Sequence, residues 1–222
     1  MAFQDEVQNY INNYVEGHIP SKDEILKQFT YIEDEELQKR IAKEYYIARY
    51  IYKFFEGMES RDELLDAEVR LQVIMFANIY EAIIHYVLFT KYSETQIVKD
   101  LEYVQTPIEI SIPSEKKKEI EDALQHSGKS IKTYYMALKR RDLTKVRFDE
   151  KAEAAFSLGL IDNDLKDEII NFYNLRNGIH LHAEIRKNII WDLEMSKMAY
   201  WRIEKINLQV SRKMKIDNKI TV

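Results

Sequence analysis

The stretch DELLDAEVRLQVIMFANIYEAIIHYVLFTKY, residues 62–92, decides the fold of this chain. Its apolar residues recur at helical spacing and surround the predicted helix on nearly every side, so the helix must be buried. The longest apolar region of the chain runs from Leu71 to Thr90, and it is interrupted by the polar residues Gln72, Asn78, Glu81 and His85. Their presence favours a protein core over a membrane span. We therefore expect residues 62–92 to form the central helix of a soluble core.

The composition of the whole chain favours helices. The 222 residues include only 5 glycines and 3 prolines, so residues that end helices are scarce. This length suits one well-filled domain, or one domain with an extension. Cysteine is absent, which excludes disulfides and thiolate metal sites, and the first residues lack the pattern of a signal peptide. The sequence thus predicts an all-α protein of the cytoplasm.

Turn-forming residues divide the chain into further helices. Ser21 and Glu24 form a capping-box pattern, which predicts that a helix begins at residue 22. Glycine and polar residues at 56–60 predict a boundary between an N-terminal helical extension, residues 1–60, and a helical core, residues 61–222. The other expected helices cover residues 2–16, 22–56, 148–158, 163–175 and 183–210, and one more begins at Ser114.

One segment departs from helical spacing. Residues 106–113 alternate apolar and polar side chains between prolines, which predicts a short extended segment or an ordered crossing loop. This pattern does not require a sheet. Helical spacing resumes at Tyr134, Tyr135, Ala137 and Leu138.

Charge is distributed unevenly along the chain. The net charge of −5 argues against a protein that coats nucleic acid non-specifically. Basic residues nevertheless dominate between residues 129 and 147, where a positive patch would attract phosphates. The candidate RNA-binding residues of this segment are Lys139, Arg140, Arg141 and Lys145. The alternative is an ordinary solvated helix face.

The stretch NLRNGIHLH, residues 174–182, carries the strongest functional signal, because it places Arg176 and Asn177 just before His180 and His182. Arginine is a permanent cation whose planar fork suits a phosphate, and histidine can exchange a proton near neutral pH. Together these groups predict a site that handles a phosphodiester, with RNA cleavage as the chemistry.

The spacing within this stretch bears on the role of each histidine. In a regular helix His180 lies about 40° from Arg176 around the axis and His182 about 120°. The two histidines would point about 200° apart, a poor geometry for metal binding, and we expect no metal and no cofactor. Gly178 gives the backbone latitude, and a second chain could supply His182 across a two-fold axis, so both histidines remain candidates.

Arg176-Asn177, followed at short spacing by histidine, resembles the motif Arg-(Asn, Asp or His)-x(3 to 5)-His of the HEPN superfamily. The resemblance covers roughly residues 62–212, and His180 and His182 follow Arg176 after three and five intervening residues. It implies an up-and-down bundle of four to five helices that forms a homodimer with two facing motifs. Many members are metal-independent endoribonucleases that act as toxins or in defence against phage.

The resemblance implies a mechanism without a cofactor. A histidine would remove the proton of an RNA 2′-hydroxyl, whose oxygen attacks the adjacent phosphate, while Arg176 stabilises the charge on the phosphoryl oxygens. The products would be a 2′,3′-cyclic phosphate and a 5′-hydroxyl. Asn177 would hold the histidine or the phosphate by hydrogen bonds, or cap the next helix.

Other interpretations stay open. Glu81 and His85, four residues apart in an apolar helix, would either line the cleft or form a structural polar pair. Arg176 would pair with Asp162 or Glu168 if its role were structural. The whole chain would then be a catalytically silent module that binds a partner protein, a nucleotide or RNA. In a third interpretation, the acidic N-terminal part docks an antitoxin or a neighbouring effector domain.

Overall fold

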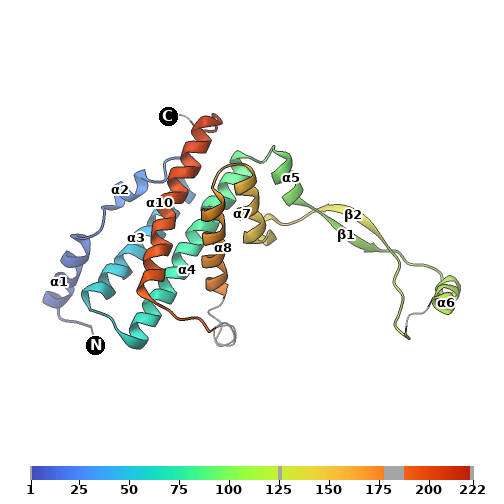
Figure 1. Cartoon of the computed structure of the whole chain (residues 1–222), viewed down its shortest axis with the longest axis horizontal. Helices are drawn as coiled ribbons and strands as arrows, with labels where there is room; N and C mark the ends of the chain where they lie inside the picture. The colour runs from blue at the N-terminus through green and yellow to red at the C-terminus, as the bar shows by residue number, and fades with distance from the viewer. Residues whose placement is uncertain (1, 125–126, 178–187, 221–222) are drawn as a thin grey trace. The chain divides into compact units, whose positions relative to one another are not determined.

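The computed structural model describes residues 2–124, 127–177 and 188–220. It divides into two units, of which unit 1 comprises Met1–Ser93 and Arg147–Val222, and unit 2 comprises Glu94–Val146. The chain is mostly helical, as the sequence predicted, and unit 2 adds a small two-stranded sheet (Figure 1). The prediction of an all-α chain was therefore wrong in this one element.

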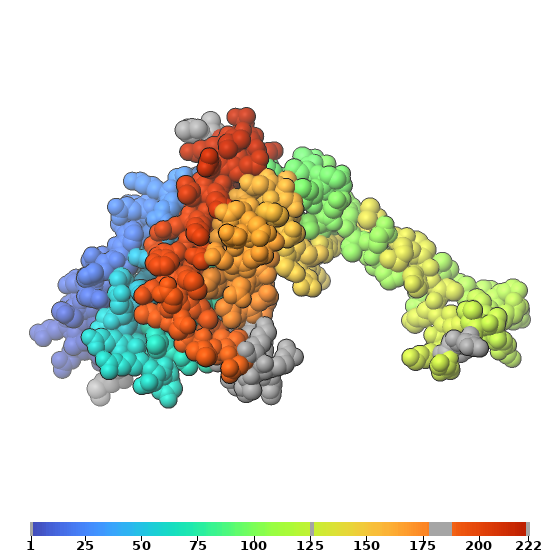
Figure 2. Space-filling model, viewed as in Figure 1, coloured from blue at the N-terminus to red at the C-terminus, as the bar shows by residue number. Residues whose placement is uncertain are grey.

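Helix α4 (Asp62–Tyr86) is the centre of unit 1 and continues into a π-helical turn, η1 (Val87–Lys91). The other helices of this unit, within the described residues, are α1 (Asp5–Glu16), α2 (Lys22–Lys27), α3 (Glu35–Gly57), α7 (Phe148–Ser157), α8 (Asn163–Asn177) and α10 (Leu193–Ile216). Helix α4 packs against α3, α7, α8 and α10. Figure 2 shows the close packing of α8 and α10 along the surface of the unit.

The side chains of α4 explain its central place. Val73, Phe76, Tyr80 and Ile83 are fully buried, and burial of each such side chain stabilises the fold by roughly 1.5–3 kcal/mol. In the described part of the chain, the helix over Asp62–Lys91 is long and apolar enough to cross a membrane, but most of it is buried inside the fold. The helix is therefore a core helix of unit 1, as the sequence predicted.

Helix caps fix several boundaries. The capping box at Ser21 and Glu24 is confirmed. The prediction of one helix over residues 22–56 was wrong, because the carboxylate of Asp34 accepts a hydrogen bond from the Leu37 amide at 3.0 Å and starts a new helix, α3. Asp192 caps α10 in the same way, so this helix begins at residue 193. The helix predicted from residue 183 was therefore wrong over residues 188–192, and residues 183–187 lie outside the described residues.

The first sixty residues belong to unit 1. Ile25 and Phe29 are fully buried, and the Tyr31 hydroxyl donates a hydrogen bond to Asn207 of α10 at 2.7 Å. Helices α1 and α2 pack against α3, which packs against α4. The division between the units therefore falls at residues 93–94 and 146–147, not at the boundary expected near residue 60, because α1–α3 share the core of α4.

Unit 2 contains α5 (Gln96–Glu102), β1 (Tyr103–Glu109), α6 (Ser114–Ala123), β2 (Tyr134–Arg140) and the short 3₁₀ turn η2 (Leu143–Lys145). The strands are antiparallel and pair Tyr103 with Arg140 and Glu109 with Tyr134. The helical spacing predicted over residues 134–138 was wrong. A run this short fits either periodicity, and the pairing of β2 with a strand about thirty residues earlier decides it.

One buried acid predicts a dependence of stability on pH. Burial, with a contribution from Glu56, raises the pKa of Glu68 from 4.5 to about 7. The native state then binds the proton more tightly than the unfolded state, so this stabilisation is full below pH 4.5 and is lost as the pH rises through about 7. We expect Glu68→Gln to raise the melting temperature at about pH 8 but much less at about pH 5. Exposed Glu63→Gln, in the first turn of the same helix, should have only a small effect that is similar at both pH values, and an equal effect of Glu68→Gln at both pH values would contradict the assignment.

Candidate functional site

Arg176 lies in the last turn of α8, where the negative end of the helix dipole favours a cation. Its Nη1 donates a hydrogen bond to Oε2 of Glu81 at 2.9 Å, and its guanidinium lies 4.9 Å from the centre of the Tyr173 ring. Tyr173 in turn stacks on Phe148 at 4.4 Å. These contacts hold the guanidinium in one orientation while 31% of the side chain stays exposed, so the arginine is both positioned and reachable.

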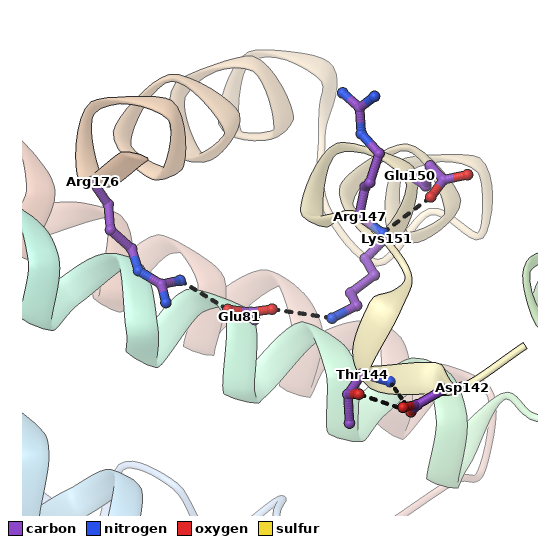
Figure 3. Close-up of polar contacts among 7 residues, drawn as sticks. All are labelled: Glu81, Asp142, Thr144, Arg147, Glu150, Lys151 and Arg176. Carbon is purple, nitrogen blue, oxygen red and sulfur yellow. Dashed lines mark hydrogen bonds and ion pairs between the residues drawn. The ribbon is translucent and has the colours of Figure 1, made fainter. Parts of the chain in front are cut away.

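Glu81 of α4 joins two cations. Its Oε1 accepts a hydrogen bond from Lys151 Nζ of α7 at 3.1 Å, while Oε2 accepts from Arg176. Figure 3 shows the lysine and the arginine reaching the carboxylate from opposite sides. Lys151 is only 1% exposed, and a buried ammonium needs such a partner. Two cations share one carboxylate, so the cluster has a net positive charge that would attract an anion.

The protonation of the site follows from these contacts. Burial alone would raise the pKa of Glu81, but the hydrogen bonds and positive charges of Lys151 and Arg176 hold it below its ordinary value. His85, one turn further along α4, has its pKa lowered by burial and by the charge of Lys151, against the opposing effect of Glu81. At neutral pH the site therefore combines an ionised carboxylate with a neutral imidazole, which can accept a proton.

A pocket of about 220 Å³ lies between the start of α7 and the second half of α8. It is lined by Arg147, Phe148, Asp149, Ile170, Tyr173, Asn174 and Asn177. Tyr173 belongs both to this pocket and to the surroundings of Arg176, and Asn177 is exposed at the end of α8. Arg147 lines the pocket and binds Asp149 through two hydrogen bonds of 3.0 and 2.8 Å, so Asp149 balances its charge.

The residues predicted from the sequence fall into three groups. Unit 1 contains Arg176, Asn177, Glu81 and His85. Within this group Arg176 contacts Glu81 directly. His180 and His182 lie outside the described residues. The four candidate RNA-binding residues, Lys139, Arg140, Arg141 and Lys145, belong to unit 2.

Two of these basic residues in unit 2 are engaged within the unit. Arg140 forms an ion pair with Glu102 at 3.1 Å, and Nε of Arg141 donates to the Leu101 carbonyl at 2.5 Å. Lys139 and Lys145 have exposed side chains. The lysines are therefore better placed than the arginines to contact a phosphate.

The sequence interpretation in which Arg176 pairs with Asp162 or Glu168 was wrong. Glu168 pairs with Arg202, and Asp162 accepts a hydrogen bond from Gln209 at 2.5 Å. Each acid is thus engaged by α10, and the partner of Arg176 is Glu81. The sequence could not show this contact, because Glu81 and Arg176 are 95 positions apart in the chain.

Lys151 was not identified from the sequence, although a signal was present. Phe148, Ala152 and Ala155 are buried and recur at helical spacing on α7. Lys151 stands on the same stripe, at a position where an apolar residue would be expected. A lysine within an apolar stripe indicates a buried cation that requires a carboxylate partner.

Comparisons of the chain with protein-family models, with curated proteins and with solved structures found no match. No site residue is therefore assigned from a relative. What the site can do follows from the chemistry of its own groups: the cations Arg176 and Lys151, the carboxylate Glu81 and the imidazole His85.

Proposed function

We propose that this protein is a metal-independent endoribonuclease of the HEPN type, which acts as a cytoplasmic homodimer in a toxin–antitoxin system or in defence against phage. The observation that supports this best is the fixed and partly exposed Arg176, held by Glu81 and Tyr173 at the end of α8. Preorganised donors that face a developing negative charge are a strong source of catalysis. The net positive charge of the Arg176–Glu81–Lys151 cluster supports the same role.

The proposed reaction is an internal transfer of the phosphodiester. His180 or His182 removes the proton of an RNA 2′-hydroxyl, and the resulting oxygen attacks the adjacent phosphorus. The bond from phosphorus to the 5′-oxygen breaks, and this oxygen takes up a proton, which leaves a 2′,3′-cyclic phosphate and a 5′-hydroxyl. Arg176 stabilises the charge on the phosphoryl oxygens during the transfer.

The test is cleavage of labelled structured RNA and of matched DNA in excess EDTA, with analysis of the product ends. The protein should cut RNA alone, because DNA lacks the 2′-hydroxyl, and should leave cyclic phosphate ends. One of the variants His180→Ala and His182→Ala should lose activity, while His85→Ala tests the neutral imidazole beside Glu81. Cleavage of DNA, or equal cleavage of RNA by all variants, would refute the mechanism.

The exposed lysines of unit 2 give a separate prediction about RNA binding. We expect Lys139→Ala and Lys145→Ala each to weaken RNA binding and to lower the slope of log affinity against log salt by about 1, because each removes one phosphate contact. Lys116→Ala is a matched control, since Lys116 binds Glu119 at 2.8 Å. Fluorescence anisotropy at several salt concentrations measures the effect, and unchanged slopes would exclude these lysines from the RNA interface.

The second candidate is a catalytically silent helical module that binds a partner protein, a nucleotide or RNA. The observation that favours it is the ion pair between Arg176 and Glu81, which leaves less than a third of the arginine side chain exposed. In this case Arg176 maintains a dimer surface or a binding surface. Absence of RNA cleavage at every protein concentration tested would favour this candidate.

A further inference from the structure

A second pocket, of about 200 Å³, lies among α3, α4 and α10 in unit 1. Its lining residues are Arg49, Tyr52, Lys53, Glu56, Gln72, Phe76, Ser196, Lys197, Tyr200 and Trp201. It is smaller than the roughly 300 Å³ at which pockets for drug-sized ligands begin. Its size therefore suits a single small ring system.

Two buried polar groups of this pocket lack partners in the described part of the chain. Gln72 is 0% exposed, and its Nε2 donates to the Ala48 carbonyl at 2.9 Å. This bond fixes the amide and leaves Oε1 as an acceptor without a donor. Ser196 is 1% exposed, and its hydroxyl also has no partner among the described residues. Buried polar groups are nearly always hydrogen-bonded, so these two could bond to the polar groups of a ligand that enters the pocket.

The other walls of the pocket favour a planar ligand. The guanidinium of Arg49 lies over the Tyr200 ring at 4.2 Å from its centre, and within the described chain its buried Nε has no acceptor. Tyr52 and Trp201 add partly exposed aromatic surface, whereas the ring of Phe76 is buried. The pocket thus combines one free acceptor, Gln72 Oε1, with donors from Arg49 and Ser196 between aromatic side chains.

We propose that this pocket binds a planar heterocycle that carries an N–H donor beside a carbonyl oxygen, as the uracil and guanine rings do. The ring N–H donates to Oε1 of Gln72, and the adjacent carbonyl oxygen accepts from the Ser196 hydroxyl or from Arg49 Nε. The aromatic side chains cover the faces of the ring. Adenine does not fit this pattern, because the ring nitrogen at the equivalent edge accepts a hydrogen bond and the exocyclic group donates one.

This site is separate from the cluster around Arg176. Gln72 and Glu81 both belong to α4, but nine residues correspond to about 180° around a helix, so their side chains leave opposite faces. Binding in the pocket therefore does not depend on the proposed ribonuclease. The two proposals can fail independently, since one is measured by binding and the other by cleavage.

The experiment is isothermal titration of the intact protein with the nucleosides uridine, guanosine, adenosine and 3-methyluridine, each up to about 1 mM. We expect uridine or guanosine to bind. We expect 3-methyluridine to bind at least about tenfold more weakly than uridine, because the methyl group replaces the hydrogen that Gln72 would accept. Gln72→Leu and Ser196→Ala should each weaken binding by about tenfold or more. Ser211→Ala is the matched control, since Ser211 lies on α10 outside the pocket and bonds to the Asn207 carbonyl.

Thermal unfolding shows whether each variant is folded. Ser196→Ala should keep the melting temperature of the natural protein, because the hydroxyl makes no bond within the described chain, so loss of binding in this variant reports on the pocket itself. The proposal is overturned if neither uridine nor guanosine binds at about 1 mM, if uridine and 3-methyluridine bind equally, or if folded Ser196→Ala binds as the natural protein does.

Discussion

Arg176→Ala is expected to lower the rate of RNA cleavage by about 100-fold or more, the largest effect on activity predicted for this protein. The variant removes the donor that would face the developing charge on the phosphoryl oxygens. Arg176→Lys should recover only part of the rate, because an ammonium cannot reproduce the planar fork of the guanidinium. The measurement is the single-turnover rate of cleavage of labelled RNA in EDTA, with each protein in excess.

A loss of activity in Arg176→Ala must be distinguished from unfolding. Glu81 keeps its hydrogen bond to Lys151 in this variant, so the fold should persist, and the circular dichroism spectrum should match that of the natural protein. Arg212→Ala, at an exposed position of α10, is the matched control and should keep full activity. Folded Arg176→Ala with an unchanged cleavage rate would remove the arginine from the mechanism.

Glu81→Leu is expected to lower the free energy of unfolding by about 3 kcal/mol, because it leaves the ammonium of Lys151 buried without a partner. The double variant Glu81→Leu with Lys151→Met should recover most of this loss, since it removes the unpaired charge and keeps the volume of both side chains. Urea denaturation of the natural protein, both single variants and the double variant measures the coupling.

A surface ion pair supplies the control for this measurement. Glu153 of α7 pairs with Lys166 at 3.2 Å, and Glu153 is mostly exposed, so Glu153→Leu should cost less than about 1 kcal/mol. Equal destabilisation by Glu81→Leu and by the double variant would contradict the role assigned to the buried pair.

The contribution of Glu81 to stability also depends on pH, because its pKa in the folded protein is held below the ordinary value of 4.5. This contribution is present above pH 4.5 and is lost as the pH falls through the lower pKa of the folded protein.

The sequence by itself determined the local features of the fold. The central helix follows from apolar side chains that surround residues 62–86 on nearly every side, and the start of α2 follows from the capping box at Ser21. Both signals act between residues of the same helix, so no distant part of the chain is needed to detect them. The pairing of β1 with β2 was not predicted, because a strand is stabilised by hydrogen bonds to a partner that is distant in sequence.

The candidate site likewise combines residues that the sequence singles out with contacts that only the tertiary structure shows. The sequence singled out Arg176 because arginine, asparagine and histidine stand close together in one short stretch. It also marked Glu81 as a polar residue in an apolar helix. Only the tertiary structure decided that these two residues bind each other and that Lys151 completes the cluster. Packing brings together side chains 95 and 70 positions apart, and the cost of burying an unpaired charge selects the partner.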